Sequence, residues 1–327
     1  MTRNLFGIPV RPVVVNAFLL LLAIDVQVAV CAAEVTFEKR PAEVCVTVDG
    51  EDVATYVYAD STIPRPYFAH VHGPGGVQLT RNHPPIEGRD RTDHATMHPG
   101  IWMAFGDFNG TDIWRNKGRV VHERFVQKPS GGSNRGWFAV KNRYETGVGE
   151  TICFEVCRFT FLVRPHGYLL LWDSTFSSDR EFYFGDQEEM GLGVRLSTPI
   201  AVTSEQGGRI LDSEGRKNGA GIWGKTADWC DYSGPIHGTF AGIAVMPHPE
   251  NFRPCWWHAR DYGFMAANPF GRAAFHAGSP SKIVIGPGAD LRLQFGLLIH
   301  ASEKENDLDV AAAYQDYLAM CRAKHEE

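Results

Sequence analysis

The fold is indicated first by residues 89–114, which read RDRTDHATMHPGIWMAFGDFNGTDIW. A charged segment opens this stretch, and residues 101–108 then predict a strand. Asn109-Gly110 is a strong hairpin-turn signal, so we expect a return strand that ends at Trp114. The stretch therefore predicts a β-hairpin with titratable side chains at its mouth.

The rest of the chain follows the same pattern from Glu34 onward, because apolar residues recur with a period of two and not 3.6. One helix is expected, capped by Asn306 or Asp307 and continuing through Leu318. Many strands with turn signals roughly every 8–12 residues predict an all-β fold, a large antiparallel β-sandwich with one C-terminal helix. We expect a single domain over residues 34–327, with two packed sub-sandwiches as the alternative. The predicted strands are 44–48, 53–58, 67–72, 101–108, 119–126, 137–144, 151–163, 168–176, 181–184, 193–197, 209–212, 221–230, 239–246, 263–266, 282–285 and 291–299.

The end of the chain resembles a known architecture. A Gly-Pro-Gly turn at residues 286–288 precedes a long apolar strand. This arrangement is similar to the last strand of galactose-mutarotase-like supersandwiches. The resemblance concerns the fold and does not by itself specify a function.

The first 33 residues predict a signal peptide. A mostly apolar segment at 13–30 follows two arginines, and Ala32-Ala33 supplies small residues for cleavage. A retained membrane anchor, made costly by Asp25, and a lipoprotein attached at Cys31 are the alternatives. We therefore expect a periplasmic or secreted protein with no membrane segment after cleavage.

Composition narrows the classes of protein further. With 44% hydrophobic and 21% charged residues, the 327-residue chain resembles ordinary globular proteins, and its net charge of -6 argues against nucleic acid as a partner. Six cysteines remain after cleavage, and their disulfide pairing is not predictable from sequence. Cys153 and Cys157 are an exception, because on one strand they would lie about 13 Å apart, too far for a disulfide.

The first group of candidate site residues is Asp93, His94 and His98. Pro99-Gly100 predicts a loop here, and a loop can direct imidazoles toward a substrate or an ion. Binding or proton transfer is one interpretation, metal ligation is a second, and histidines satisfied by the loop backbone are a third. Asp107 in the following turn is a candidate substrate-binding residue.

A second group is His70-Val71-His72, whose spacing on a strand would put both imidazoles on one side. Such a pair recurs among metal ligands, so His70 and His72 are the metal candidates. The alternative is chance, because the chain has 13 histidines.

The acidic candidate is the segment 185–193, which reads GDQEEMGLG. Glycines bracket three carboxylates, so the backbone can turn sharply and leave the acids in a cleft. Neighbouring carboxylates raise one another's pKa, which would suit Glu188 for a general acid. A solvated acidic turn and a calcium-like oxygen cluster are the alternatives.

The densest aromatic and polar run is WWHARDY at residues 256–262. In an extended chain His258 and Arg260 point the same way, and an aromatic platform beside them would suit a sugar ring. We therefore take Trp257, together with Trp102 of the predicted hairpin, as candidate stacking residues. A core strand with buried tryptophans is the alternative.

Several of these motifs together resemble a known family. They are Arg65-Pro-Tyr67, Asp93-His94 with His98-Pro-Gly-Ile-Trp102, the GDQEEMGLG segment, and WWHARDYG with Asn268-Pro-Phe-Gly271. They resemble the uncharacterised secreted bacterial family labelled methane oxygenase PmoA, common in planctomycetes, whose members often occur among carbohydrate-processing neighbours. Members usually read Asp-His-Pro-His-His-Arg-Gly-Leu-Trp in the central loop, and here Pro99 stands at the arginine and one histidine is missing or displaced. We do not predict methane oxidation, because a methane monooxygenase subunit of that name is a bundle of membrane helices.

The leading hypothesis is a secreted carbohydrate-active protein with acid/base groups at His94, His98, Glu188 and His258. Epimerisation, β-elimination and hydrolysis would each use such groups. The expected substrate is a carbohydrate or another small polar molecule. No cofactor is required, although a divalent metal is an open alternative. A non-catalytic carbohydrate-binding module and a metal-dependent oxidoreductase using His70, His72 and His94 are the competing classes. The substrate-contacting residues would be Asp93, Trp102, Asp107, Trp257 and Arg260.

Overall fold

The computed structural model describes residues 32–323. The predicted signal peptide, residues 1–33, lies almost wholly outside this range and stays a prediction. Between residues 32 and 323, no helix has the length and apolar character needed to cross a membrane.

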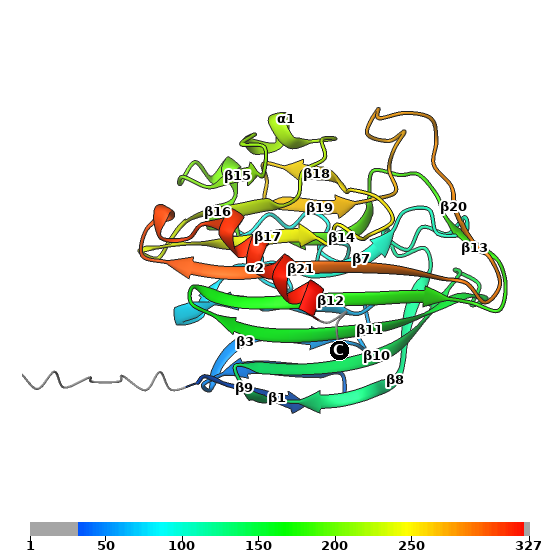
Figure 1. The fold of residues 1–327 in the computed structure, drawn as a ribbon, viewed down its shortest axis with the longest axis horizontal. Coiled ribbons are helices and arrows are strands. Elements are labelled where there is room, and N and C mark those ends of the chain that lie inside the picture. The colour runs from blue at the N-terminus through cyan, green and yellow to red at the C-terminus, as the bar shows by residue number, and fades with distance from the viewer. Residues whose placement is uncertain (1–31, 324–327) are drawn as a thin grey trace, which may run out of the picture. The chain divides into compact units, whose positions relative to one another are not determined.

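Two large antiparallel sheets dominate the described part of the chain (Figure 1). The first has nine strands, and in spatial order they are β18 (Trp256–Arg260), β19 (Phe264–Asn268), β14 (Met190–Arg195), β7 (Ile101–Phe105), β4 (Tyr67–Ala69), β3 (Glu51–Val57), β2 (Glu43–Val48), β1 (Glu34–Lys39) and β9 (Gly132–Ser133). The second has eight strands, and in spatial order they are β15 (Arg209–Asp212), β16 (Cys230–Ile236), β17 (Thr239–Pro247), β21 (Asp290–Ser302), β12 (Gly167–Ser177), β11 (Thr151–Arg164), β10 (Arg135–Glu145) and β8 (Arg119–Ser130).

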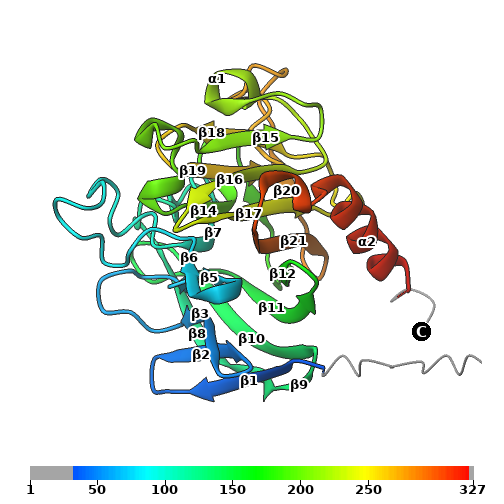
Figure 2. The same ribbon diagram turned by 90° about the vertical axis from the view of Figure 1, so that its left-hand side faces the viewer.

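Smaller elements connect and cover these sheets. Two ribbons of two strands each pair β13 (Phe182–Phe184) with β20 (Ile283–Ile285), and β5 (His72–Gly73) with β6 (Val77–Gln78). The helices are α1 (Asn218–Ile222) and α2 (Val310–Ala323), with 3₁₀ turns at Pro74–Gly76, Thr198–Ile200, Val202–Ser204 and Glu305–Asp307. In Figure 2 the loop that follows β6, drawn in cyan, projects away from the strands.

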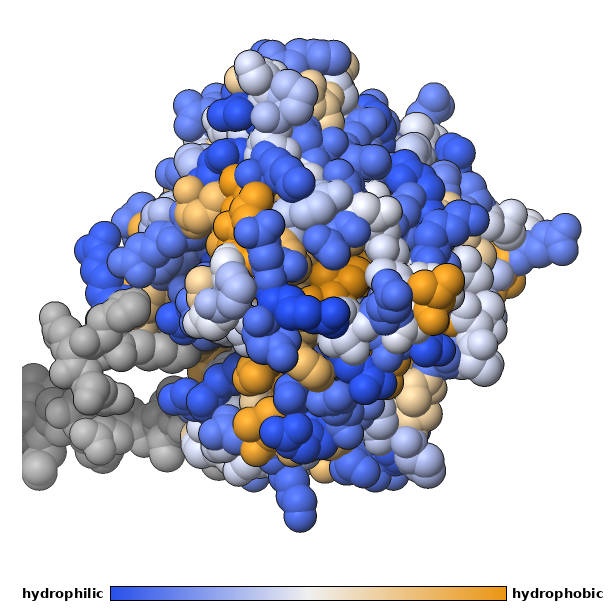
Figure 3. Space-filling view, turned by 90° about the vertical axis from the view of Figure 1, so that its right-hand side faces the viewer, coloured by the Kyte–Doolittle hydropathy of each residue, from blue (hydrophilic) through white to orange (hydrophobic). Residues whose placement is uncertain are grey.

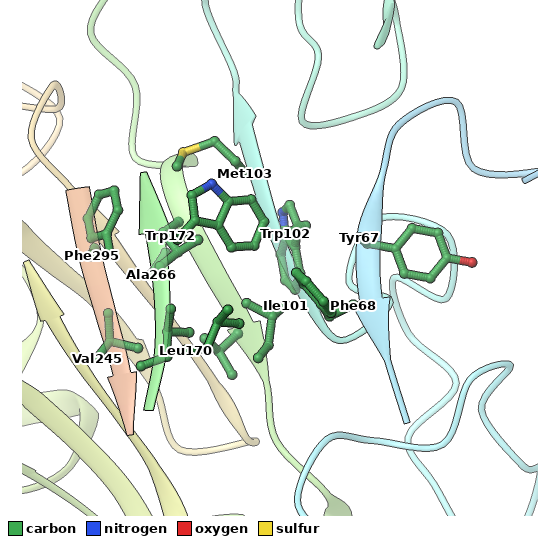
Figure 4. Close-up of a cluster of buried hydrophobic side chains, with 14 of the residues drawn as sticks. Tyr67, Phe68, Ile101, Trp102, Met103, Leu170, Trp172, Val245, Ala266 and Phe295 are labelled. Atoms are coloured by element: carbon green, nitrogen blue, oxygen red, sulfur yellow. The ribbon is translucent and has the colours of Figure 1, made fainter. Parts of the chain in front are cut away.

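The main hydrophobic core lies between the inner faces of the two sheets. Successive residues of a strand point to opposite faces, so Leu170 and Trp172 of β12 enter this core, whereas Leu169 and Leu171 point outward to α2. The Trp172 ring meets Phe68 of the other sheet edge-on, with ring centroids 5.8 Å apart (Figure 4). Aromatic contacts of this kind join the sheets into a sandwich.

Helix α2 covers part of the outer face of the eight-stranded sheet (Figure 1). Its Tyr314 and Tyr317 belong to a second apolar cluster with residues of β12, β17 and β21. The Asp309 side chain caps the helix by accepting the Ala312 N–H at 3.1 Å. The predicted caps, residues 306 and 307, lie instead in the preceding 3₁₀ turn.

The predicted antiparallel sandwich with a C-terminal helix is confirmed, but some local predictions are wrong. Residues 221–230 do not form a strand, because α1 ends at Ile222 and β16 begins at Cys230. Asn109 and Gly110 do turn, with φ of 52° and 80°, yet no return strand follows them to Trp114. Strand β7 pairs with β14 and β4 instead, and Trp114 packs against Trp102 at 5.2 Å.

The surface in Figure 3 is mostly hydrophilic, with apolar residues in several separate patches. No disulfide joins the cysteines of the described chain, and Cys153 and Cys157 lie on one strand as expected. Some large apolar side chains of the described chain are exposed. These exposed residues are Ile86, Val126, Val148, Val156, Phe252 and Val284.

Candidate active site

Strands β18 and β19 at the edge of the nine-stranded sheet position the first candidate residues. His258 and Arg260 point to one face of β18, because side chains alternate along a strand. Arg260 pairs with Phe264 in the register of the two strands, so Phe264 shares that face. The opposite face of β18 carries Trp257, which is fully buried in the main core. The candidate site therefore lies on the outer face of the sheet.

Glu188 meets His258 and Arg260 at this outer face. The Glu188 Oε1 atom lies 3.1 Å from His258 Nε2, accepts the Trp223 Nε1–H at 2.7 Å, and forms an ion pair with Arg260. The Glu188 carbonyl oxygen lies 3.2 Å from His258 Nδ1. Asn268 Nδ2 donates to the same carbonyl at 3.0 Å, which holds the loop in place. Glu188 and His258, two of the four predicted acid/base residues, are thus in direct contact.

Burial governs the protonation state of His258. The His258 side chain is 5% exposed, and burial lowers its pKa to about 4. The Glu188 carboxylate opposes that shift and the Arg260 charge reinforces it. At neutral pH the imidazole is therefore neutral and can take up a proton. The Glu188 side chain is 33% exposed, so the pair is open to a ligand from the carboxylate side.

The loop that carries His94 and His98 forms a turn and not a helix, as predicted. The His98 N–H donates to the His94 carbonyl at 2.8 Å, and the two imidazole rings stack at 4.8 Å. His98 stacks in turn on Phe264 at 4.8 Å and on Trp102 at 4.9 Å. Burial lowers the pKa of His98 well below its usual value, whereas His94 is exposed. His98 is therefore a neutral member of a ring stack, and His94 is the member of this pair that faces solvent.

Phe264 separates the four predicted catalytic residues into two groups. The His98 ring stacks on Phe264 and the His258 ring meets it edge-on, each with centroids 4.8 Å apart. The two imidazole centroids are therefore at most twice that distance apart. The structure brings His94, His98, Glu188 and His258 to one region of the sheet, but it joins Glu188 only to His258.

Asp93 organises the histidine loop. Its Oδ1 atom accepts the Arg195 Nη2–H at 2.9 Å, and its Oδ2 atom lies 3.0 Å from His94 Nδ1. Burial opposes the ionisation of Asp93, but His94 and Arg195 outweigh it and lower its pKa. Arg81, which is buried, donates to the backbone carbonyl of Asp93 at 2.7 Å. Asp93 is thus held by internal ion pairs, and its substrate-binding role stays a prediction.

The two tryptophans predicted to stack on a substrate are fully buried. Trp102 lies beneath His98, and Trp257 donates its Nε1–H to the Ala227 carbonyl at 3.2 Å. Neither ring presents a face to a ligand, so these two assignments do not fit the structure. Trp223, which the sequence analysis missed, is half-buried and contacts Glu188. It sits just after α1 within the segment that was expected to be a strand.

The other acidic residues of the 185–193 segment have structural partners. Asp186 accepts backbone N–H groups from Ala273 at 2.9 Å, Ala274 at 3.0 Å and Ser281 at 2.7 Å, which fixes the neighbouring loop. Glu189 forms an ion pair with Arg115, another residue that the sequence analysis did not single out. Glu188 is therefore the carboxylate of this segment that reaches His258.

Asp107 belongs to the turn after β7. Its Oδ1 atom accepts the Gly110 N–H at 3.1 Å, and its carbonyl accepts the Gly185 N–H at 2.8 Å. Asp107 therefore acts as a turn residue, because aspartate side chains commonly accept backbone N–H groups in turns. The substrate-binding role predicted for Asp107 is not needed to account for it.

His70 and His72 do not share a strand. Strand β4 ends at Ala69, His70 has φ of 50°, and β5 begins at His72. A positive φ breaks the alternation on which the same-side prediction rested. Across residues 32–323 no three His, Cys, Asp or Glu side chains gather as a metal site would require. The metal-dependent alternative with His70, His72 and His94 therefore has no assembled ligand set in this part of the chain.

Comparison with protein families identifies the chain. A model of the family of unknown function DUF6807 matches residues 43–315. The chain belongs to this family. No curated protein matches it.

Comparison with solved structures finds similar arrangements of strands. A galactose mutarotase-like protein from Lactobacillus casei ATCC 334 has 10% identity and a TM-score of 0.38, over 81% of this chain and 100% of that one. A galactose mutarotase-like protein from Clostridium acetobutylicum has 10% identity and a TM-score of 0.41, over 83% of this chain and 99% of that one. An alpha-galactosidase from Geobacillus stearothermophilus has 11% identity and a TM-score of 0.36, over 83% of this chain and 41% of that one. At these values the likeness says nothing about activity.

Proposed function

We propose that the chain is an acid/base enzyme that acts on a carbohydrate or another small polar molecule. The observation that carries the proposal is the contact between the buried imidazole of His258 and the partly exposed carboxylate of Glu188. Acid/base catalysis needs a group that takes a proton and a group that returns one, within hydrogen-bond reach of the substrate. The pair supplies both groups on one open face of a sheet.

The neighbouring residues suit the same chemistry. Arg260 is 37% exposed, so it can bind a substrate oxygen while it orients Glu188. The half-buried Trp223 lies beside Arg260, with the guanidinium carbon 5.5 Å from the ring centroid, and offers an apolar surface for the C–H face of a sugar ring. In this proposal the partly exposed Glu188 carboxylate takes a proton from a sugar carbon or hydroxyl, and the buried His258 imidazole beside it is the base that finally accepts that proton.

The proposal is tested with the 34–327 chain and a panel of neutral and acidic sugars in D₂O. Proton NMR would detect carbon-bound hydrogen exchange, epimers and elimination products in one experiment. We expect His258→Asn and Glu188→Gln to lower turnover by about 10²–10⁴-fold, the usual contribution of a general acid or base. His166→Asn, at an exposed turn between β11 and β12, is the matched control. Turnover that survives in both site variants would contradict the proposal.

A non-catalytic carbohydrate-binding protein is the second candidate, and the Trp223–Arg260 surface favours it. A binder would use that surface without proton transfer. Sugar affinity that persists in Glu188→Ala, with no turnover by the wild-type protein, would select this candidate. Trp223→Ala would then lower the affinity, whereas His166→Asn would leave it unchanged.

The proposed location is the periplasm or the exterior, with residues 1–33 removed and residues 34–327 acting as one mature domain. The apolar segment and the small residues before Glu34 support this proposal. Intact mass of the protein exported from a bacterial host would show whether cleavage occurs after Ala33. A mass that includes the first 33 residues would contradict it.

A further inference from the structure

A separate hollow lies beside the candidate active site. It is next to the turn between β18 and β19, which contains Tyr262. Its volume is about 240 Å³. Three of the residues that line it are arginines, and four carry hydroxyl groups. The arginines are Arg81, Arg91 and Arg195, and the hydroxyl-bearing residues are Thr198, Thr203, Ser204 and Tyr262.

The positive charge of this hollow exceeds the negative charge next to it. Asp93 Oδ1 lies 2.9 Å from Arg195 Nη2, 3.4 Å from Arg91 Nε and 3.7 Å from Arg81 Nη1. Asp90 is a second nearby carboxylate, and it accepts the Thr198 hydroxyl at 2.7 Å. The three guanidinium groups of the hollow therefore outnumber these two carboxylates, which favours an anionic ligand.

Two of the nitrogen atoms of Arg195 make no hydrogen bond within the described chain. Its side chain is 1% exposed, and its Nε and Nη1 atoms have no hydrogen-bond partner among residues 32–323. A buried charged donor without an acceptor destabilises the folded protein, and a planar guanidinium matches an oxyanion with two oxygens. Arg195 and Arg91 both pack on the Tyr262 ring, with guanidinium carbons 4.6 Å and 5.1 Å from its centroid. This packing holds both arginines at the wall of the hollow.

Phe264 connects the hollow with the acid/base pair. The Tyr262 ring stacks on Phe264 at 6.2 Å, and Phe264 meets His258 at 4.8 Å. The Tyr262 and His258 ring centroids are therefore no farther apart than the sum of these two distances. A ligand that spans the hollow and the Glu188–His258 pair would place an anionic group at Arg195 and a reacting carbon near His258.

We infer that this hollow, named here the arginine pocket, binds an oxyanion of the substrate, a carboxylate or a sulfate carried by a sugar. The inference rests on the proposed function, because it names the class of substrate for the same face. Acidic sugars are then favoured over neutral ones by charge-assisted hydrogen bonds.

Isothermal titration with sodium sulfate, sodium acetate, galacturonate and galactose tests the inference at constant ionic strength. We expect saturable one-to-one binding of sulfate or acetate, and tighter binding of galacturonate than of galactose. The sulfate and acetate arms distinguish the two sources of the oxyanion. Lack of saturable binding by both sulfate and acetate would overturn the inference.

Two variants test whether the anion binds in the arginine pocket. Arg91→Gln removes one charge at a side chain that is 55% exposed, so the fold should tolerate it. Arg195→Lys keeps the charge but loses the planar fork. Each should weaken anion binding about tenfold or more. Arg158→Gln, in a different hollow on the eight-stranded sheet, is the matched control. Binding lost in Arg158→Gln and kept in Arg91→Gln would overturn the assignment.

Failure of the inference and failure of the proposed function are distinguishable. Glu188→Gln should bind the anion like the wild-type protein while losing turnover. Turnover of neutral sugars with no preference for acidic ones would refute the arginine pocket as part of the active site. Saturable anion binding that Arg91→Gln abolishes would support the pocket even where no sugar is turned over.

Discussion

Replacement of His258 by asparagine tests the protonation state on which the proposed chemistry depends. Burial lowers the pKa of His258 from the usual 6.5 to about 4 in the folded protein. Between these two values the unfolded chain binds a proton that the folded protein does not bind. The free energy of unfolding is therefore fully retained above pH 6.5 and is lost as the pH falls toward 4. At about 1.4 kcal/mol per pH unit, the loss due to His258 reaches about 3 kcal/mol.

The assay is urea unfolding of the 34–327 chain at a series of pH values from about 4 to 7.5. We expect the wild-type protein to lose about 3 kcal/mol more than His258→Asn across this range. Burial also lowers the pKa of His98, but His98 is present in both proteins and cancels in the comparison. His166→Asn, at the exposed turn, should follow the wild-type curve.

Equal losses in the wild-type protein and His258→Asn would refute the reasoning. His258 would then keep its proton in the folded state, and the Glu188 carboxylate would outweigh burial and Arg260. The imidazolium would serve as an acid at the start of a reaction, and the assignment of His258 as the base would be wrong. The experiment needs no substrate, so it can precede the search for an activity.

Two further predictions concern packing and a buried acid. Alanine at Gly193 would place its Cβ 2.6 Å from the Trp102 ring, so we expect a loss of about 1–3 kcal/mol in urea unfolding, whereas alanine at Gly286, which has open space, should be tolerated. An unchanged midpoint for Gly193→Ala would contradict this packing. Burial raises the pKa of Glu155, so the folded state holds its proton more strongly, and stability should fall as the pH rises from about 4.5 through the raised value. Glu155→Gln should remove that fall, and identical pH profiles for the two proteins would count against a raised pKa.

The sequence predicted those parts of the candidate site that depend on residues close together in the chain. Glycines around residues 185–193 indicated a sharp turn, and Glu188 does emerge from it. Alternation along WWHARDY put His258 and Arg260 on one face, which the register of β18 with β19 confirms. The site could be outlined because these signals depend on residues close together in the chain.

The incorrect or missing predictions concern residues whose contacts come from parts of the chain that are distant in sequence. The sequence pattern predicts Trp102 and Trp257 as stacking residues for a ligand, but the His98 ring covers Trp102 and the main core surrounds Trp257. The contact of Asp93 with Arg195 joins residues 102 positions apart, which no local pattern reveals. Trp223 was missed because its partner Glu188 is 35 positions away.

The sequence by itself determined the class of fold, since a two-residue period forces strands with one face toward a core, and a helical run after residue 307 forces the single long helix. Only the tertiary structure decided which strands became neighbours. The pairing of β14 with both β7 and β19 places Trp102, Gly193 and Ala266 side by side and brings Glu188 to His258. Strand order depends on the packing of whole sheets, and a register displaced by one residue would turn every one of these side chains to the other face.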